Sequence, residues 1–232
     1  TPTPTSTPLP GSLIDTSVVD FLSCAVPTGL TVANESGGEI RLSAALEDYF
    51  DSAPSPDKWT WGTWNTGTFM PAPINGVLPV ASSAGGAWIR STSTYSQQSV
   101  EALIAFGAGP MQALGWSEDG FVGNYAVVST DNNGQTLHAR TASGGSETSS
   151  ELVGVPLSAY HLFRIDWQPT RVDYFVDNDL VATHEIALGN PMYAYLSNGD
   201  STSTLYAEWA RVGHYQVGPA IYTSCVKDVS AV

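Results

Sequence analysis

Hydrophobic and polar residues alternate along the stretch from residue 160 to residue 186, which reads YHLFRIDWQPTRVDYFVDNDLVATHEI. Phe163, Ile165 and Trp167 are separated by single polar residues, the period of two that is typical of a strand with one buried face. Two further apolar runs follow, separated by Asp177-Asn178-Asp179, residue types that tolerate the positive φ of a tight hairpin turn. The pattern therefore predicts three consecutive antiparallel strands.

Similar short runs recur along most of the chain, separated by turn residues. Strand signals spaced about 8–12 residues apart are typical of an all-β sandwich or barrel, and no helical period extends beyond about two turns. Ala44 to Phe50 is predicted as a short helical turn, stopped by Pro54 and Pro56. The other predicted strands are 39–42, 77–81, 87–91, 99–106, 111–116, 125–130, 136–141, 192–197 and 204–215.

The first ten residues, TPTPTSTPLP, differ in composition from the rest. Proline fixes φ and favours extended polyproline II, so residues 1–10 are predicted to be a semi-rigid Thr/Pro-rich linker. Residues 11–232 fit one large all-β domain. Such linkers join the modules of extracellular proteins, so we expect this chain to be one module of a larger protein, or to be tethered to a cell surface.

The charge balance narrows the possible partners. The chain has 22 acidic and 8 basic residues, a formal net charge of −14. Nucleic acids and anionic membranes are bound through Lys and Arg, so we expect neither as a partner. No apolar run reaches the roughly 18 residues of a membrane span, and no signal peptide is present, as expected for a mature secreted chain. The acidic, lysine-poor composition suits contact with neutral or weakly charged polymers, although solubility alone also explains it.

Four segments resemble one known superfamily. Residues 160–186 are similar to "x-I-D-W-x-P-x-x-I-x-x-Y-V-D-G", a pattern of the concanavalin A-like lectin/glucanase superfamily. Residues 97–116 resemble the strand pair "Y-x-x-x-E-A-R-x-K-x-x-x-G-x-x-x-A-x-W" of family-16 glucanases, residues 205–216 the closing strand "M-x-V-D-Y-V-R-V-Y-Q", and residues 75–91 the early strand "N-G-x-L-x-I". The resemblance implies an all-β fold, a concanavalin A-like jelly-roll β-sandwich of two antiparallel sheets.

Within such a fold the two cysteines are predicted to form a disulfide. Jelly-roll termini often lie side by side, and Cys24 and Cys225 lie near opposite ends of the chain, each inside a short run that suits an edge strand. Two buried free thiols are the alternative. The bridge would indicate an oxidising, extracellular compartment.

The resemblance fails at the catalytic motif. Family-16 enzymes carry their nucleophile and acid/base as E-x-D-x-E or E-x-D-x-x-E, a spacing that places both carboxylates on one strand face for a retaining mechanism. The corresponding region here, residues 116–130, reads WSEDGFVGNYAVVST. Glu118 and Asp119 are adjacent, so on a strand they would point to opposite faces. No catalytic residue is carried over, and whether the chain is an enzyme is left open.

Three residues form the predicted ligand site. Glu101 matches the Glu of the family's E-A-R strand, and Gln112 and Trp116 lie on the strand that follows it. We expect the three to meet on the concave sheet, with Trp116 as a plate for a sugar ring and the other two bonding its hydroxyls. Core packing is the alternative for Trp116.

A polysaccharide lyase on the same fold would need other residues. Gln112 or Arg140 would neutralise a uronate, and His138 and Tyr195 would handle the proton. His138 and Arg140 share a strand face by the period of two, but such residues usually only solvate it. The resemblance also places Glu208 on the closing strand, where an acid helps to hold a structural Ca²⁺. No cofactor is required.

Three functions remain open at this point. The first is a secreted carbohydrate-recognition module that binds a polysaccharide or oligosaccharide. The second is a polysaccharide-degrading enzyme, either a lyase or a glycoside hydrolase with an unusual carboxylate pair. The third is a structural subunit of an extracellular assembly, in which the Thr/Pro-rich segment docks on a neighbour.

Overall fold

The computed structural model describes residues 30–33 and 39–215, which divide into two compact units. The first contains a hairpin of β1 (Leu30–Ala33) and β2 (Glu39–Leu42), which pair antiparallel. The second is a β-sandwich over Ala44–Tyr215. Within the described residues, no helix is long and apolar enough to cross a membrane.

Two of the sequence predictions fall on residues that this description leaves out. They are the linker at residues 1–10 and the disulfide between Cys24 and Cys225. Both stay predictions, as does the assignment of residues 11–232 to one domain.

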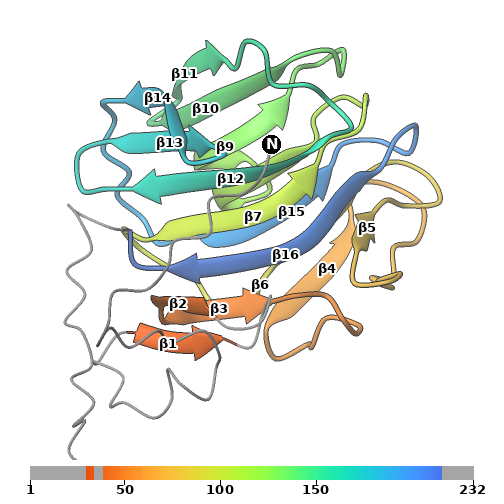
Figure 1. Cartoon of the computed structure of the whole chain (residues 1–232). Helices are drawn as coiled ribbons and strands as arrows, with labels where there is room; N and C mark the ends of the chain where they lie inside the picture. The colour runs from red at the N-terminus through yellow and green to blue at the C-terminus, as the bar shows by residue number, and fades with distance from the viewer. Residues whose placement is uncertain (1–29, 34–38, 216–232) are drawn as a thin grey trace, which may run out of the picture. The chain divides into compact units, whose positions relative to one another are not determined.

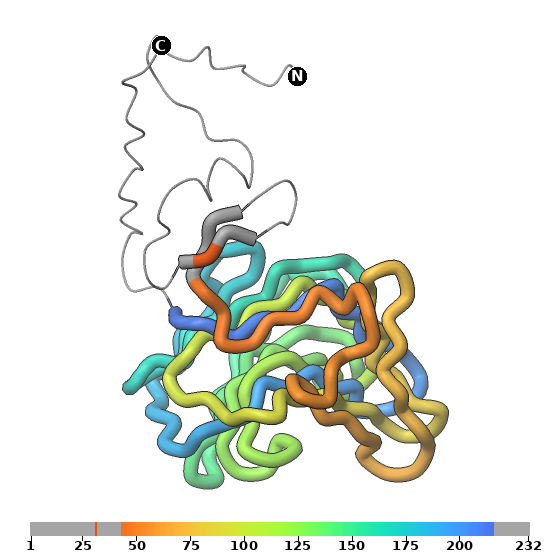
Figure 2. The backbone as a smooth tube through the Cα atoms, turned by 90° about the horizontal axis from the view of Figure 1, so that it is seen from below, coloured from red at the N-terminus to blue at the C-terminus, as the bar shows by residue number. Residues whose placement is uncertain are grey.

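The sandwich consists of two sheets, here called sheet I and sheet II (Figure 1). Sheet I has the order β11-β10-β9-β8-β15-β6-β4. Sheet II has the order β14-β13-β12-β7-β16-β3, with β5 also paired to β16. Neighbouring strands pair antiparallel throughout, and Figure 2 shows the two layers one above the other. The predicted jelly-roll sandwich of two antiparallel sheets is confirmed.

The strands of sheet I are β4 (Trp59–Thr63), β6 (Ala87–Ser91), β8 (Ala113–Asp119), β9 (Val122–Thr130), β10 (Leu137–Ser143), β11 (Ser146–Glu151) and β15 (Tyr193–Asn198). Those of sheet II are β3 (Ala44–Asp48), β5 (Leu78–Val80), β7 (Ser99–Ala105), β12 (Tyr160–Trp167), β13 (Val172–Val176), β14 (Asp179–His184) and β16 (Leu205–Gly213).

Aromatic and aliphatic side chains from both sheets fill the space between them. Trp116 of β8 and Trp167 of β12 meet edge to face with ring centroids 6.0 Å apart, and Phe106 and Phe163 do the same at 5.2 Å. All four are almost completely buried. Because side chains alternate along a strand, the residues between these core positions point to the outer face of each sheet.

The three-strand meander predicted from residues 160–186 is confirmed as β12, β13 and β14. The turn between β13 and β14 has Asp177 at φ 50° and Asn178 at φ 72°, the backbone for which short polar residues are favoured.

The helical turn predicted over residues 44–50 is wrong. This stretch forms the edge strand β3, in which Leu46 is buried and opposite Val212 of β16. Pairing with a neighbouring strand outweighed the local preference of Ala, Leu and Glu for helix. Strands β1, β4 and β11 are not among the predicted strands. β11 consists of polar residues alone, and the alternation of β4, Trp59-Thr60-Trp61, covers only three residues before Gly62.

Candidate functional site

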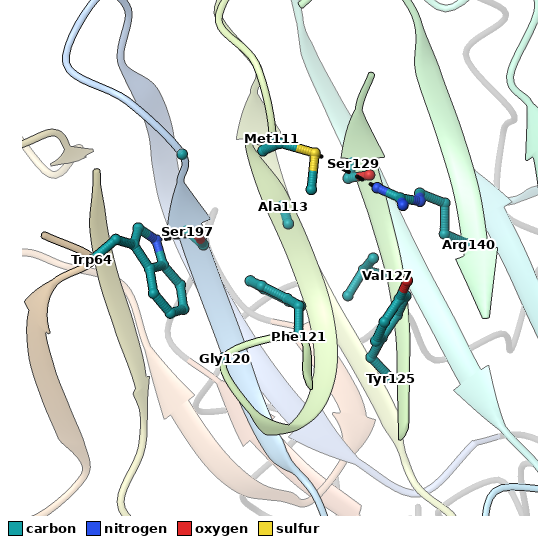
Figure 3. Close-up of a pocket in the computed structure, with 11 residues that line it drawn as sticks. Trp64, Met111, Ala113, Gly120, Phe121, Tyr125, Val127, Ser129, Arg140 and Ser197 are labelled. Carbon is teal, nitrogen blue, oxygen red and sulfur yellow. Dashed lines mark hydrogen bonds between the residues drawn. The ribbon is translucent and has the colours of Figure 1, made fainter. Parts of the chain in front are cut away.

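An open pocket with a volume of about 400 Å³ lies on the outer face of sheet I (Figure 3). Its floor is formed largely by β9, whose residues Ala126 and Val128 point into the core. Tyr125, Val127 and Ser129 therefore point outward and line the pocket. The full lining is Trp64, Met111, Ala113, Gly120, Phe121, Tyr125, Val127, Ser129, Arg140, Ser197 and Gly199.

The turn between β8 and β9 places an aromatic ring in this pocket. Asp119 pairs with Val122, so Gly120 and Phe121 form a two-residue turn, and both have positive φ, 57° and 65°. That conformation costs free energy for a residue such as Phe and is often retained at functional sites. A Cβ atom on Gly120 would lie 2.7 Å from the ring of Trp64, so only glycine allows this close approach.

Three aromatic side chains follow one another across the pocket. The ring of Phe121 lies 6.0 Å from Trp64 and 6.2 Å from Tyr125, and Figure 3 shows it between them. The indole N–H of Trp64 donates to Ser197 Oγ at 3.1 Å, which fixes the ring orientation. Together, Trp64, Phe121 and Tyr125 are called the aromatic strip. They are partly exposed, so a ligand can reach them.

Charged residues border the other end of the strip. Arg140 of β10 donates from Nε and Nη2 to both carboxylate oxygens of Glu147 on β11, at 3.1 and 2.8 Å. The phenol of Tyr125 donates to the same carboxylate. Arg140 Nη1 also lies 3.7 Å from the sulfur of Met111 (Figure 3). The three hydrogen bonds on Glu147 hold the wall of the pocket in one geometry.

The same contacts set the protonation of these groups. Burial opposes ionisation of Glu147, but the hydrogen bonds from Arg140 and Tyr125 outweigh it and lower the pKa of Glu147. Burial, with the hydrogen bond to Glu147, raises the pKa of Tyr125 to about 12. Near neutral pH, Glu147 is ionised and Tyr125 keeps its proton.

The residues of β9 that face the pocket have the spacing of the family-16 catalytic motif, but their side chains are not carboxylates. Tyr125, Val127 and Ser129 occupy positions i, i+2 and i+4 on one face, the spacing of E-x-D-x-E. None of them is a carboxylate. Glu118 and Asp119 do not replace them, because they lie at the end of β8 beside the turn, and neither lines the pocket.

Glu118 ties neighbouring loops together instead. It accepts hydrogen bonds from Asn190 Nδ2 at 2.6 Å and from the backbone and side-chain amides of Asn124 at 3.1 and 2.8 Å. The backbone N–H of Asn124 and the amide of Asn190 lower the pKa of Glu118. It is a structural carboxylate that anchors the start of β9.

The prediction that Glu101, Gln112 and Trp116 meet on one sheet is wrong. Glu101 lies on β7 of sheet II and receives a hydrogen bond from Arg211 Nε at 2.8 Å. Trp116 is completely buried between the sheets, so it cannot serve as a sugar platform. Trp116 instead packs in the core, as the alternative interpretation predicted. Leu114, two residues earlier on the same face of β8, lies in the core as well.

Gln112 is also completely buried, just before β8. Its Oε1 accepts from the backbone N–H of Gly107 at 2.7 Å, and its Nε2 donates to Ser203 Oγ at 2.7 Å. The side chain fastens two loops at one end of sheet I, and none of its polar groups is directed toward the pocket.

The residues predicted for a lyase are only partly brought together. His138 and Arg140 do share the outer face of β10, with Ala139 between them in the core. Tyr195 lies on β15, which is separated from β10 by two strands, a distance of about 14 Å. Its hydroxyl accepts from Arg90 Nη1 at 3.0 Å and from the Gly120 N–H at 3.2 Å. This geometry does not give one proton-transfer site.

Glu208 lies at an irregularity of β16. The register against β7 shifts between Ala207 and Trp209, so Glu208 is the extra residue of a β-bulge. Within the described residues, no group of three or more His, Cys, Asp and Glu side chains is placed to hold a metal. A structural Ca²⁺ at Glu208 stays a prediction, because carbonyl oxygens also bind calcium.

Sequence reasoning missed most residues of the pocket, and Arg140 is the one lining residue that it named. Phe121 lies in a turn, and Glu147, which is bonded to the pocket wall, lies on a strand of polar residues, so neither belongs to an apolar alternation. Trp64 follows directly after β4. Tyr125 had a signal: with Val127 and Ser129, it matches the two-residue spacing of the catalytic motif, with other residue types.

Comparison with known proteins agrees with this fold. The model of the glycosyl hydrolases family 16 matches residues 121–207, which include β9 and most of the pocket. Among curated protein sequences, none matches the chain. The resemblance to the concanavalin A-like superfamily, and within it to family 16, is thus confirmed.

Several solved structures share the jelly roll at low sequence identity. A glycosyl hydrolase family protein of Mycobacterium fortuitum is 16% identical, with a TM-score of 0.57, over 74% of this chain and 100% of that one. An endo-beta-1,3-glucanase of Pyrococcus furiosus is 16% identical, with a TM-score of 0.57, over 83% of this chain and 100% of that one. A beta-glucanase of Bacillus licheniformis is 13% identical, with a TM-score of 0.56, over 75% and 100%. At these identities the likeness shows the fold alone.

Proposed function

We propose that the sandwich binds a neutral or weakly charged polysaccharide in the pocket on the outer face of sheet I. Sugar rings present apolar C–H faces and a rim of hydroxyls, and sites for such ligands combine aromatic surfaces with a few fixed polar groups. The aromatic strip supplies the first, and the partly exposed guanidinium of Arg140 lies at its end as a fixed polar group. The relatives of similar fold are named as glucanases and glycosyl hydrolases, which supports a glycan as the ligand.

One observation favours binding over cleavage. The three pocket-facing residues of β9 are Tyr125, Val127 and Ser129, at the spacing that catalytic carboxylates have in family-16 enzymes. In the described part of the chain, no Asp or Glu lines the pocket. A retaining or inverting glycosidase of the usual kind needs two carboxyl groups at the scissile bond.

Glu147 keeps a hydrolase or lyase as the second candidate. It is an ionised carboxylate held by two residues of the pocket wall, Tyr125 and Arg140. A retaining mechanism would need a second carboxyl group about 5–5.5 Å away. Product release from neutral glucans, galactans and uronates tests this candidate, and absorbance near 235 nm would identify an unsaturated lyase product. Turnover that is lost in Glu147→Gln would replace the binding proposal with an enzyme.

Binding itself is tested on a glycan array and by pull-down with insoluble polysaccharides. Trp64→Ala should lower the affinity for the bound polysaccharide at least tenfold, because it removes the largest ring of the aromatic strip. Tyr206→Ala is the matched control, since Tyr206 is an aromatic residue of sheet II with 43% of its surface exposed. Its affinity should equal that of the wild type. No binding to any plant, fungal or bacterial polysaccharide would refute the proposal.

We further infer that the chain acts outside the cell as part of a larger protein. The Thr/Pro-rich residues 1–10 and the acid excess support this setting. Thiol titration of the denatured, unreduced protein tests it through Cys24 and Cys225. Absence of reactive thiol is expected, and two reactive thiols would remove the argument for an oxidising compartment.

A further inference from the structure

A second group of side chains on the outer face of sheet I lies beside the pocket and is centred on Arg90 of β6. Its guanidinium carbon lies 4.2 Å from the ring centroid of Tyr193, 5.3 Å from Trp88 and 5.8 Å from Tyr195. These rings are contributed by β6 and β15, which are neighbours in the sheet. Stacking on aromatic rings holds a planar guanidinium in place without a charged partner.

The carboxylate that pairs with Arg90 is weakly held. Asp119 accepts from Arg90 Nη1 at 3.2 Å, and its side chain is 88% exposed. By contrast, Arg140 pairs with both oxygens of Glu147, whose side chain is 31% exposed, and Arg211 pairs with Glu101, which is 13% exposed. An ion pair as exposed as that of Asp119 contributes little to stability. Asp119 can therefore leave Arg90 at little cost.

Arg90 also keeps unused donor capacity. Its Nη1 contacts Asp119 and the hydroxyl of Tyr195, whereas its Nη2 makes no hydrogen bond among the described residues. A guanidinium carries five N–H donors in a fork that fits a carboxylate or sulfate through two parallel bonds. The single bond to Asp119 does not use that fork.

The Arg90 cluster adjoins the pocket directly. The ring of Tyr195, which contacts Arg90, lies 5.3 Å from Phe121 of the aromatic strip. The ring of Trp88 lies 6.2 Å from Trp64. A glycan that follows the strip toward β6 therefore meets Arg90 next.

We propose that Arg90 is a subsite for an acidic substituent of the glycan, a carboxylate or sulfate group that displaces Asp119. The proposal rests on the proposed function, because it extends the same site by one sugar position. It specifies the ligand class: a largely neutral polysaccharide that carries acidic groups. Asp119 occupies the place of that group in the absence of ligand, so it competes with every acidic ligand and lowers the affinity for it.

Two small probes that differ only at C6 test the subsite, methyl β-D-glucuronide and methyl β-D-glucoside. Both are titrated into ¹⁵N-labelled protein, with the Nε–H signal of Arg90 reporting the subsite and the indole signal of Trp64 reporting the pocket. The glucuronide should shift the Arg90 signal and the glucoside should not. Asp119→Asn should bind the glucuronide several-fold more tightly than the wild type, with no change for the glucoside. Arg90→Gln should abolish the preference.

The outcomes separate the two proposals. Equal shifts of Trp64 by both sugars, with Arg90 unmoved, would overturn the subsite and leave the pocket intact. A response of Arg90 to the glucuronide without any response of Trp64 would support the subsite and contradict the pocket. No response at either signal would refute both. Asp119→Asn should keep the wild-type melting temperature, because its side chain is exposed, so its result does not depend on folding.

Discussion

The outer faces of the two sheets use polar and aromatic residues in opposite ways. On sheet II, Arg164, Glu101 and Arg211 stand directly opposite one another on three neighbouring strands, so that charges of alternating sign cross the sheet. On sheet I, the outer face carries the aromatic strip, of which only Tyr125 lies within a strand, and a pocket of about 400 Å³ lies over it. Both faces derive from strands of the same period, so alternation alone does not distinguish them.

The difference lies in where the polar groups find partners. On sheet II, Glu101 is bonded to Arg211, and Arg164 lies 3.9 Å from the ring of Phe175. These side chains pair with one another across strands, which stabilises the sheet. On sheet I, the partly exposed rings of Trp64, Phe121 and Tyr125 leave apolar surface open to a ligand. Sheet II is thus expected to contribute stability, and sheet I binding.

The largest expected effect concerns Trp116, which is buried between the two sheets. Trp116→Ala should lower the free energy of unfolding by roughly 3–5 kcal/mol, because it removes a fully buried ring that packs on Trp167. Denaturant unfolding measures this loss. Glycan affinity per folded molecule should not change, and a variant of wild-type stability with weaker binding would restore Trp116 as a sugar platform.

A smaller loss of stability is expected on sheet II. Glu101→Gln should cost about 1–3 kcal/mol, because it removes a charged hydrogen bond from a partly buried arginine. Binding should be unaffected, since Glu101 does not lie on the pocket face. Unfolding curves and polysaccharide affinity are measured on the same preparation. Reduced affinity at unchanged stability would show that ligand binds to sheet II.

The smallest effect is a pH dependence at the edge of sheet I. The pKa of Glu147 in the folded protein lies below its ordinary value. The ionised carboxylate therefore stabilises the fold above the pKa of the unfolded chain, about 4.3. This stabilisation is lost as the pH falls through the pKa of the folded protein. Glu147→Gln should thus be less stable than the wild type at pH 7 and equal to it near pH 3. The pKa of Tyr125, about 12, keeps its hydrogen bond to Glu147 intact through the alkaline range in ordinary use.

Differential scanning calorimetry of both proteins across this range measures the gap in melting temperature. A gap that stays constant down to pH 3 would mean that the hydrogen bonds from Arg140 and Tyr125 do not favour the ionised form of Glu147.

The sequence was sufficient for the fold because the fold depends on repeated local patterns. The meander of β12 to β14 could be predicted from alternation and from the Asp-Asn turn. The failures fall where the pattern is absent or tertiary pairing decides. Ala44–Asp48 has helix-favouring residues yet pairs with β16, and β11 is polar at every position because it is an exposed edge strand.

The site was less predictable because it depends on which sheet each strand joins. Glu101 and Trp116 lie on consecutive strands, but β7 belongs to sheet II and β8 to sheet I. Strand order is set by long-range pairing that a single sequence does not reveal. Phe121 was missed for another reason, since its position depends on a turn with positive φ at a bulky residue, which is rare.

The central claim is that ligand binds on the outer face of sheet I and not on that of sheet II. Titration of ¹⁵N-labelled protein with an oligosaccharide of the bound polysaccharide tests it most directly, since each sheet carries a partly exposed tryptophan, Trp64 and Trp209. The indole signal of Trp64 should shift in a saturable manner while that of Trp209 stays in place. A saturable shift of Trp209 with Trp64 unmoved would contradict the account.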